Sequence, residues 1–183
     1  MTYYGPKELA ASFRTVRGNT LKIAEEIAEE NYGFRAAPGT RSVAETLVHI
    51  ALGPRLQEQI HFIEHRSTLN GFDFFAFMGK LIAEEQTPRS KSEILDLLRT
   101  EGDKYAKALE GTSEALLGEI VEYPQGMVPP SKSRFEMLIS AKEHEMHHRA
   151  QLMVAERLLG ITPHLTRQMQ EHIAAMKSAH ATS

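Results

Sequence analysis

Cysteine is absent from the 183 residues of this chain, and basic residues are not in excess. Without cysteine there is no disulfide, no thiolate nucleophile, no cysteine-based zinc site and no iron–sulfur cluster. Lysine and arginine number 21 against 24 acidic residues, a formal net charge of −3. Non-specific binding to nucleic acid requires a basic surface, so we expect no nucleic-acid partner. If the chemistry needs a soft metal ligand, one of the nine histidines must supply it.

Long apolar runs are also absent, because no stretch approaches the roughly 18 residues needed to cross a bilayer. Residues 1–8 lack the basic and apolar regions of a secretory signal. We therefore expect a soluble, cytoplasmic protein with no membrane partner. The length is close to that of one average domain, and residues 1–183 are predicted to form a single domain.

The hydrophobic periodicity is helical along nearly the whole chain, and no alternating pattern typical of a strand stands out. The proline-rich segment 123–130 cannot lie inside a helix and is predicted to be a long crossover loop. These features predict an all-α fold, a four-helix bundle with short extra helices, whose core spans about 7–165. The long helices cover 6–30, 42–65, 90–110 and 133–159, and shorter pieces lie within 66–88 and at 113–120 and 162–177.

Three Ser-x-x-Glu sequences mark the starts of the second, third and fourth long helices. In such a capping box the serine side chain and the glutamate side chain each bind the backbone N–H of the other residue. The second long helix also contains Gly53-Pro54, which should kink it near its middle. The boxes are Ser42-Val43-Ala44-Glu45, Ser90-Lys91-Ser92-Glu93 and Ser133-Arg134-Phe135-Glu136.

Histidines concentrate on the fourth long helix. His144 and His148 lie about 40° apart around its axis and about 6 Å apart along it, a spacing at which two imidazoles can chelate one ion. Both lie in the apolar stripe of this helix, whereas His147 lies at the edge of the stripe. A buried imidazole needs a partner, so the pair is either hydrogen-bonded in the core or bound to a metal. The solvated side is predicted to carry Lys142, Glu145, Arg149 and Glu156.

A site with three histidine ligands needs one more from another helix, and His49 is the candidate. It shares one face of the second long helix with apolar residues and therefore points into the bundle. His61 and His65 repeat the four-residue spacing but lie on the side that carries Glu58, so we expect them at the surface. The apolar residues on the His49 face are Leu52, Leu56, Ile60 and Ile63, and the histidines expected to be solvated also include His164, His172 and His180.

Glu101 lies on the inward face of the third long helix, together with Ile94 and Leu98. A carboxylate there can orient a metal ligand or act as a general base. The alternative is a glutamate at the edge of the bundle that reaches solvent.

Three motifs together resemble the DinB/YfiT-like superfamily over about 7–165. The resemblance implies a four-helix bundle in which His49, His144 and His148 hold a divalent ion, zinc or nickel, with open coordination positions. It also implies a frequent homodimer, and relatives include thiol-dependent transferases and isomerases that use bacillithiol or mycothiol. Ala150 stands where such proteins usually carry glycine. The motifs are His144-Glu145-Met146-His147-His148-Arg149-Ala150-Gln151, Leu47-Val48-His49-Ile50 and Leu159-Gly160-Ile161-Thr162-Pro163.

A site of three neutral histidines leaves the charge of a divalent ion uncompensated, which favours an anion such as hydroxide or thiolate in the open positions. We therefore expect a metal-dependent enzyme of the thiol S-transferase type that acts on a small-molecule substrate. Because the chain has no cysteine, the sulfur would come from a diffusible thiol. The alternatives are a metal-dependent hydrolase with the same site and a non-catalytic, stress-related bundle that binds a metal or ligand.

Overall fold

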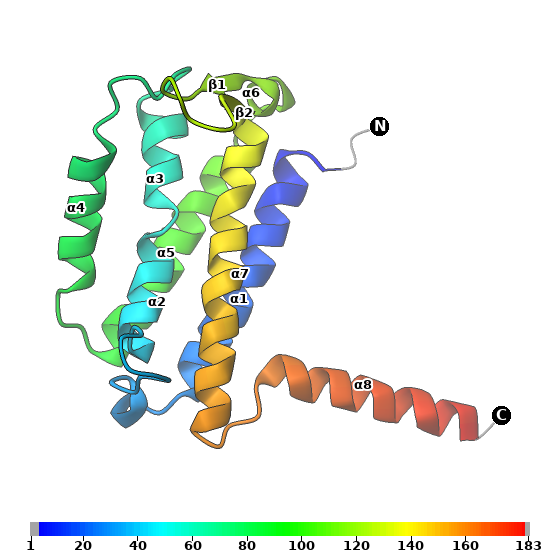
Figure 1. The fold of residues 1–183 in the computed structure, drawn as a ribbon. Coiled ribbons are helices and arrows are strands. Elements are labelled where there is room, and N and C mark those ends of the chain that lie inside the picture. Colours follow the sequence, from blue (N-terminus) through cyan, green and yellow to red (C-terminus); the bar gives the residue numbers. More distant parts are fainter. Residues whose placement is uncertain (1–3, 182–183) are drawn as a thin grey trace.

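Four long helices make up a bundle within residues 4–181, the part of the chain that the structure, a computed structural model, describes. They are α1 (Pro6–Glu26), α2 (Val43–Leu52) continued by α3 (Arg55–Glu58), α5 (Lys91–Glu110) and α7 (Arg134–Leu158). α1 and α2 each pack against both α5 and α7. α1 and α2 therefore occupy two opposite corners of the bundle, and α5 and α7 occupy the other two (Figure 1). The connections from α1 to α2 and from α5 to α7 therefore cross the ends of the bundle. This arrangement confirms the predicted all-α, four-helix fold.

Serine capping boxes start three of these helices, as the sequence predicts. The side chains of Ser42, Ser90 and Ser133 each accept a hydrogen bond from the backbone of the glutamate three residues later, and that glutamate binds the serine N–H in return. Each box satisfies donors that a helix start leaves unpaired. α1 ends before the predicted residue 30, because Ile27 takes an extended conformation (φ −73°, ψ 124°).

Shorter elements lie between the long helices: η1 (Glu29–Asn31), η2 (Gln59–Ile63), α4 (Phe74–Glu85) and α6 (Glu114–Gly118). The predicted kink at Gly53-Pro54 corresponds to the break between α2 and α3. Both residues keep right-handed helical dihedral angles, so the chain continues in the same general direction (Figure 1). The following segment η2 is a π-helix, which shifts the angular positions of its side chains relative to an α-helix.

α4 lies beside α2, outside the four-helix core (Figure 1). Its side chains are mostly exposed or half-buried, and Leu81 is the buried apolar anchor. Ionic contacts add to this anchor, because Glu84 pairs with both Arg55 of α3 and Arg89. α4 therefore covers one side of α2 without being part of the main core.

A small hairpin occupies the connection between α5 and α7. β1 (Ile120–Glu122) pairs antiparallel with β2 (Ser131–Ser133), and Val121 lies opposite Lys132. The sequence pattern did not indicate these two strands, because strands of three residues are too short to show an alternating pattern. The predicted crossover loop 123–130 connects the two strands.

The core consists of two large apolar clusters stacked along the bundle. One contains Ile23, Leu47 and Leu98, and the other contains Phe13 and Tyr105. Tyr105 satisfies its buried hydroxyl by donating a hydrogen bond to the Leu138 carbonyl (2.9 Å). These clusters account for most of the buried apolar surface that stabilises the fold.

α8 (His164–Ala181) leaves the bundle at the end of α7 and projects away from it (Figure 1). It begins slightly after the predicted residue 162 and extends beyond the predicted residue 177. Within residues 4–181, no helix combines the length and the apolar character required to cross a membrane.

Candidate metal centre

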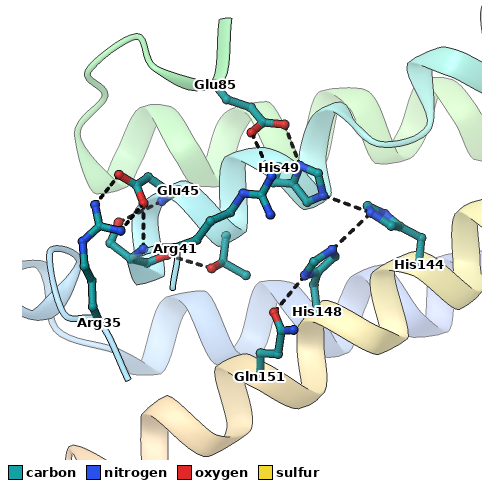
Figure 2. A network of polar contacts seen from close by, with 10 residues as sticks. Arg35, Arg41, Glu45, His49, Glu85, His144, His148 and Gln151 are labelled. Carbon is teal, nitrogen blue, oxygen red and sulfur yellow. Dashed lines mark hydrogen bonds and ion pairs between the residues drawn. The ribbon is translucent and has the colours of Figure 1, made fainter. Parts of the chain in front are cut away.

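Three histidine side chains meet between α2 and α7 (Figure 2). His49 comes from α2, and His144 and His148 come from adjacent turns of α7. The Nε2 atom of His144 lies 3.0 Å from Nε2 of His49 and 3.1 Å from Nε2 of His148. One ring nitrogen of each residue lies within 4.8 Å of the others. The structure therefore brings together the three histidines that the sequence singles out.

A polar neighbour fixes the outer nitrogen of two of these rings. Nδ1 of His49 lies 2.6 Å from Oε1 of Glu85, which is the last residue of α4. Nδ1 of His148 lies 2.9 Å from Oε1 of Gln151, one turn later on α7. Both oxygens accept, so Nδ1 carries the proton in each ring. With one proton per ring, the inward Nε2 atoms of His49 and His148 then each carry a lone pair.

One proton on Nε2 of His144 cannot form hydrogen bonds to both neighbouring histidine nitrogens. Nε2 of His144 faces the two lone pairs of His49 and His148, and one N–H can donate to just one of them. A cation between the rings accepts all three nitrogens. Zn–N bonds of about 2.0–2.1 Å in tetrahedral geometry place ligand nitrogens about 3.3 Å apart, close to the 3.0 and 3.1 Å between Nε2 of His144 and Nε2 of His49 and His148. The residues therefore fit a divalent ion with further coordination positions free for other ligands.

Burial favours the neutral form of two of the three imidazoles, those of His144 and His148. It lowers the pKa of His144 to about 4, and the other nearby histidines and Arg41 add to this effect. Burial also lowers the pKa of His148, against the opposing effect of its hydrogen bond to Gln151. Neutral imidazole is the form that binds a metal, so the lowered pKa values of His144 and His148 favour metal binding by these two residues.

Gly53 allows α2 and α7 to approach closely at the site. A Cβ atom at this position would lie 3.1 Å from Nδ1 and 3.3 Å from Cε1 of His144. These distances are shorter than ordinary van der Waals contacts between carbon and ring atoms. The absence of a side chain at Gly53 therefore sets the position of the His144 ring.

A buried ion pair next to the histidines joins four helices. The Arg17 guanidinium of α1 donates to both carboxylate oxygens of Glu145 on α7, at 2.9–3.1 Å. The same group donates to the carbonyl oxygens of Leu98 on α5 (2.6 Å) and Ile50 on α2 (3.3 Å). Gly102 leaves room for it, because a Cβ there would lie 2.9 Å from the Arg17 side chain. Glu145 follows His144 directly, so this network helps to fix the rotation of α7.

Cavities adjoin the histidines on both sides. A cavity of about 600 Å³ is lined by His148, Gln151 and Arg41 at one end. A second cavity of about 300 Å³ is lined by His49, His144 and Glu85, among mostly apolar neighbours. A small molecule therefore has space on either side of the three rings.

Comparison with known proteins decides the family of this chain. The model of the DinB family matches residues 1–178. The chain belongs to the DinB family. No curated protein matches the sequence.

Solved structures of other DinB-type proteins share the fold at low sequence identity. YfiT from Bacillus subtilis, described as a probable metal-dependent hydrolase with an unusual four-helix bundle topology, has 14% identity and a TM-score of 0.65, over 88% of this chain and 91% of that one. A DinB family protein from Exiguobacterium sibiricum has 21% identity and a TM-score of 0.58, over 87% and 94%. The DinB-like protein YjoA from Bacillus subtilis has 22% identity and a TM-score of 0.57, over 85% and 94%.

Two histidines of this DinB protein were predicted to be solvated and are buried instead. His61 is 0% exposed, because Arg134 at the start of α7 covers it and binds its Nδ1 (3.0 Å). Its position in the π-helical η2 also differs from the α-helical phase on which the prediction rested. His164 is 1% exposed, since the start of α8 packs against α1, where its Nε2 contacts Asn19 (3.2 Å). His65, His172 and His180 are exposed, as expected.

Two predicted surface glutamates of α7 are buried as well. Glu145 is 1% exposed and Glu156 is 0% exposed. α7 contacts α1 in addition to α2, so its buried arc is wider than its apolar stripe. His147, predicted at the edge of that stripe, is exposed, and its Nε2 accepts from the Gln151 amide (3.2 Å).

Glu101 does not reach the three histidines. It is 8% exposed and binds Arg55 through two hydrogen bonds of 2.8 and 3.0 Å. The expectation of a glutamate reaching solvent is therefore wrong. Its partner Arg55 also binds Glu84, so Glu101 helps to hold α4 on the bundle.

In this DinB protein, sequence analysis did not identify the residues that contact the three histidines. Gln151 belongs to the quoted family motif, and its position one turn after His148 was a usable signal. Glu85 carries no such signal, because it is distant from His49 in sequence and belongs to the least regular helical segment. Arg41 precedes the Ser42 capping box and has no ligand-like spacing.

Proposed function

We propose that this protein is a divalent-metal-dependent enzyme whose ion is held by His49, His144 and His148. The proposal rests mainly on one observation: Nε2 of His49 and Nε2 of His148 both face Nε2 of His144, while their Nδ1 atoms are bound by Glu85 and Gln151. Nitrogen ligands of this kind suit zinc or nickel. The description of YfiT as a probable metal-dependent hydrolase supports a metal-dependent activity in a protein of this fold.

The reaction that fits best is transfer of a small thiol to an electrophilic small molecule. A divalent ion supplies a Lewis acid that helps a weak nucleophile to ionise near neutral pH. Glu85 and Gln151 hold the outer nitrogens of their histidine partners, which keeps the inward lone pairs in place. The chain has no cysteine, so the sulfur comes from a low-molecular-weight thiol, of which bacillithiol and mycothiol are examples.

Hydrolysis is the second candidate, with water in place of the thiol. The description of YfiT favours it. The same histidines and the same cavities serve both reactions, so the nucleophile distinguishes them.

A comparison of two assays tests the proposal. The zinc- or nickel-loaded protein is given monochlorobimane with a series of small thiols, and separately p-nitrophenyl acetate in water. We expect saturable thiol transfer that His148→Ala abolishes and His172→Ala, an exposed control on α8, leaves unchanged. Ester hydrolysis without thiol transfer would establish the hydrolase instead. Bound metal without either reaction would contradict an enzymatic role and leave a metal-binding bundle.

We also propose that the protein forms a homodimer through α8. Met169, Ile173 and Met176 recur at helical spacing on α8 and are 60%, 39% and 46% exposed. The helix projects away from its own bundle, so its apolar stripe is available to the same stripe of a second copy (Figure 1).

A further inference from the structure

The larger cavity beside the histidines combines one cation with apolar walls. Its volume is about 600 Å³, and His148 and Gln151 lie at the end nearest the three rings. Arg41 is its charged lining residue, and no aspartate or glutamate within residues 4–181 lines it. The apolar walls are formed by Phe34, Val43, Leu152, Val154 and Ala155.

The Arg41 guanidinium has unused hydrogen-bonding capacity. Nη2 lies 3.6 Å from Oε2 of Glu85, which is an ion-pair distance and too long for a hydrogen bond. The side chain is 43% exposed, and it makes no hydrogen bond to any residue in the described part of the chain. A guanidinium offers five N–H donors in a planar fork that matches two oxygens of an anion. Figure 2 shows Arg41 extending toward His49 and Glu85, so these donors lie beside the rings.

The smaller cavity on the other side has the opposite charge. Its lining includes the Glu85 carboxylate and the apolar residues Leu56 and Met78. Arg41 and Glu85 form an ion pair, but Arg41 lines the larger of these two cavities and Glu85 the smaller one, so an anion finds a guanidinium donor in the larger cavity and a carboxylate in the smaller one. The two cavities differ in charge as well as in volume, and this difference gives the three rings a preferred side for an anionic molecule.

We propose that the larger cavity binds an amphipathic anion, with its acidic head on Arg41 and its apolar body along Phe34 and Leu152. This inference deepens the proposed function and rests on it for the reaction, because the anion would lie next to His148. A carboxylate and a phosphate ester offer the same paired oxygens to Arg41. The substrate class is accordingly a small molecule with an acidic group and an aliphatic or aromatic body of moderate size.

Binding of three six-carbon probes tests this proposal directly. Hexanoate, hexyl phosphate and hexanamide are titrated into the zinc-loaded protein by calorimetry, and their positions are mapped by NMR shifts of the Leu152 and Ala155 amides. We expect at least one of the two anions to bind about tenfold more tightly than hexanamide, and Arg41→Gln to remove that advantage. Tighter binding of hexanoate or of hexyl phosphate identifies which acidic group the cavity prefers. Arg35→Gln is the matched control, because Arg35 lies on the same segment and outside the cavity lining.

The same titration without zinc separates this inference from the proposed metal site. Arg41-dependent binding that persists in the metal-free protein supports the anion site even if no metal binds. Equal binding of the anions and hexanamide would overturn the proposal, as would equal losses in Arg41→Gln and Arg35→Gln. Shifts confined to residues around Leu56 and Met78 would also overturn it, because they would place the probe in the smaller cavity.

Discussion

At the scale of single residues, hydrogen-bond partners determine what each histidine can do. His49 and His148 direct Nε2 toward the centre of the site because Glu85 and Gln151 bind their Nδ1 atoms. His61 is more completely buried than either, but both of its nitrogens are satisfied by Gln57 and Arg134. Burial alone therefore does not make a histidine available to a metal.

Replacing Glu85 with glutamine tests the role of the outer partner. Loss of the carboxylate removes the charged acceptor that holds the proton on Nδ1 of His49. We expect the zinc dissociation constant to rise about 10- to 100-fold, as for other residues that orient metal-bound histidines. Competition titration with a chromogenic chelator measures it. Glu143→Gln is the control, because Glu143 is an exposed carboxylate on α7, and an equal effect of both variants would argue against this role.

Glu156 provides a pH test that is separate from the histidines. Both carboxylate oxygens are buried without a hydrogen-bond partner among residues 4–181. Burial, reinforced by Glu26, raises the pKa of Glu156 from 4.5 to about 7, against the opposing effect of Arg167 and Arg157. The folded state then holds this proton more tightly than the unfolded state between about pH 4.5 and 7. The carboxyl group therefore lowers the free energy of unfolding progressively across this range, and by its full amount above pH 7.

The variant Glu156→Gln should remove this pH-dependent loss. We expect it to raise the free energy of unfolding by about 2 kcal/mol at pH 8 and to have little effect at pH 5. Urea denaturation of parent and variant at both pH values measures the difference. A difference that is the same at pH 5 and pH 8 would mean that Glu156 does not titrate in this range.

At the scale of secondary-structure elements, α7 is buried on two sides, and this explains both the success and the errors of the sequence analysis. Its apolar stripe correctly places His144 and His148 toward α2. The side toward α1 is also buried, but it carries Glu145 and Glu156, which a hydrophobic stripe does not reveal. The partner of Glu145 is Arg17, more than a hundred residues away in sequence, so no local pattern indicates the pair.

The close approach of α2 and α7 predicts the effect of Gly53→Ala. An added Cβ would lie 3.1 Å from Nδ1 of His144 and push the ring away from the other two. We expect zinc affinity to fall at least severalfold while the far-ultraviolet circular dichroism stays unchanged. Gly18→Ala is the matched control, because no atom lies within 4 Å of its added Cβ. That control should keep zinc affinity and gain about 0.5–1 kcal/mol of stability, and unchanged affinity in Gly53→Ala would contradict the account.

At the scale of the whole molecule, the sequence predicts the four-helix bundle better than it predicts the elements packed around the bundle. Helical periodicity and capping boxes predict the four long helices because these signals are local. The hairpin, the docking of α4 and the burial of His164 depend on contacts between distant segments, so the sequence pattern does not contain them. Glu85 belongs to this second group, although it completes the candidate site.

The projecting α8 predicts how the molecule associates. If its stripe pairs with a second copy, Ile173→Glu places charge in the interface, and we expect the mass to fall from about two chains to one. Analytical ultracentrifugation over a range of concentrations measures this. Gln168→Glu adds the same charge at an exposed polar position and should keep the dimer. A parent protein that is monomeric at every concentration would refute the proposed association.

Metal stoichiometry tests the central claim most directly. Zinc-loaded parent protein, freed of excess metal, is compared by elemental analysis with His49→Ala, His144→Ala, His148→Ala and the exposed control His172→Ala. We predict about one ion per chain in the parent and the control, and a large loss in each of the other three. Stoichiometric zinc that survives His144→Ala, or a parent that retains none, would contradict the account.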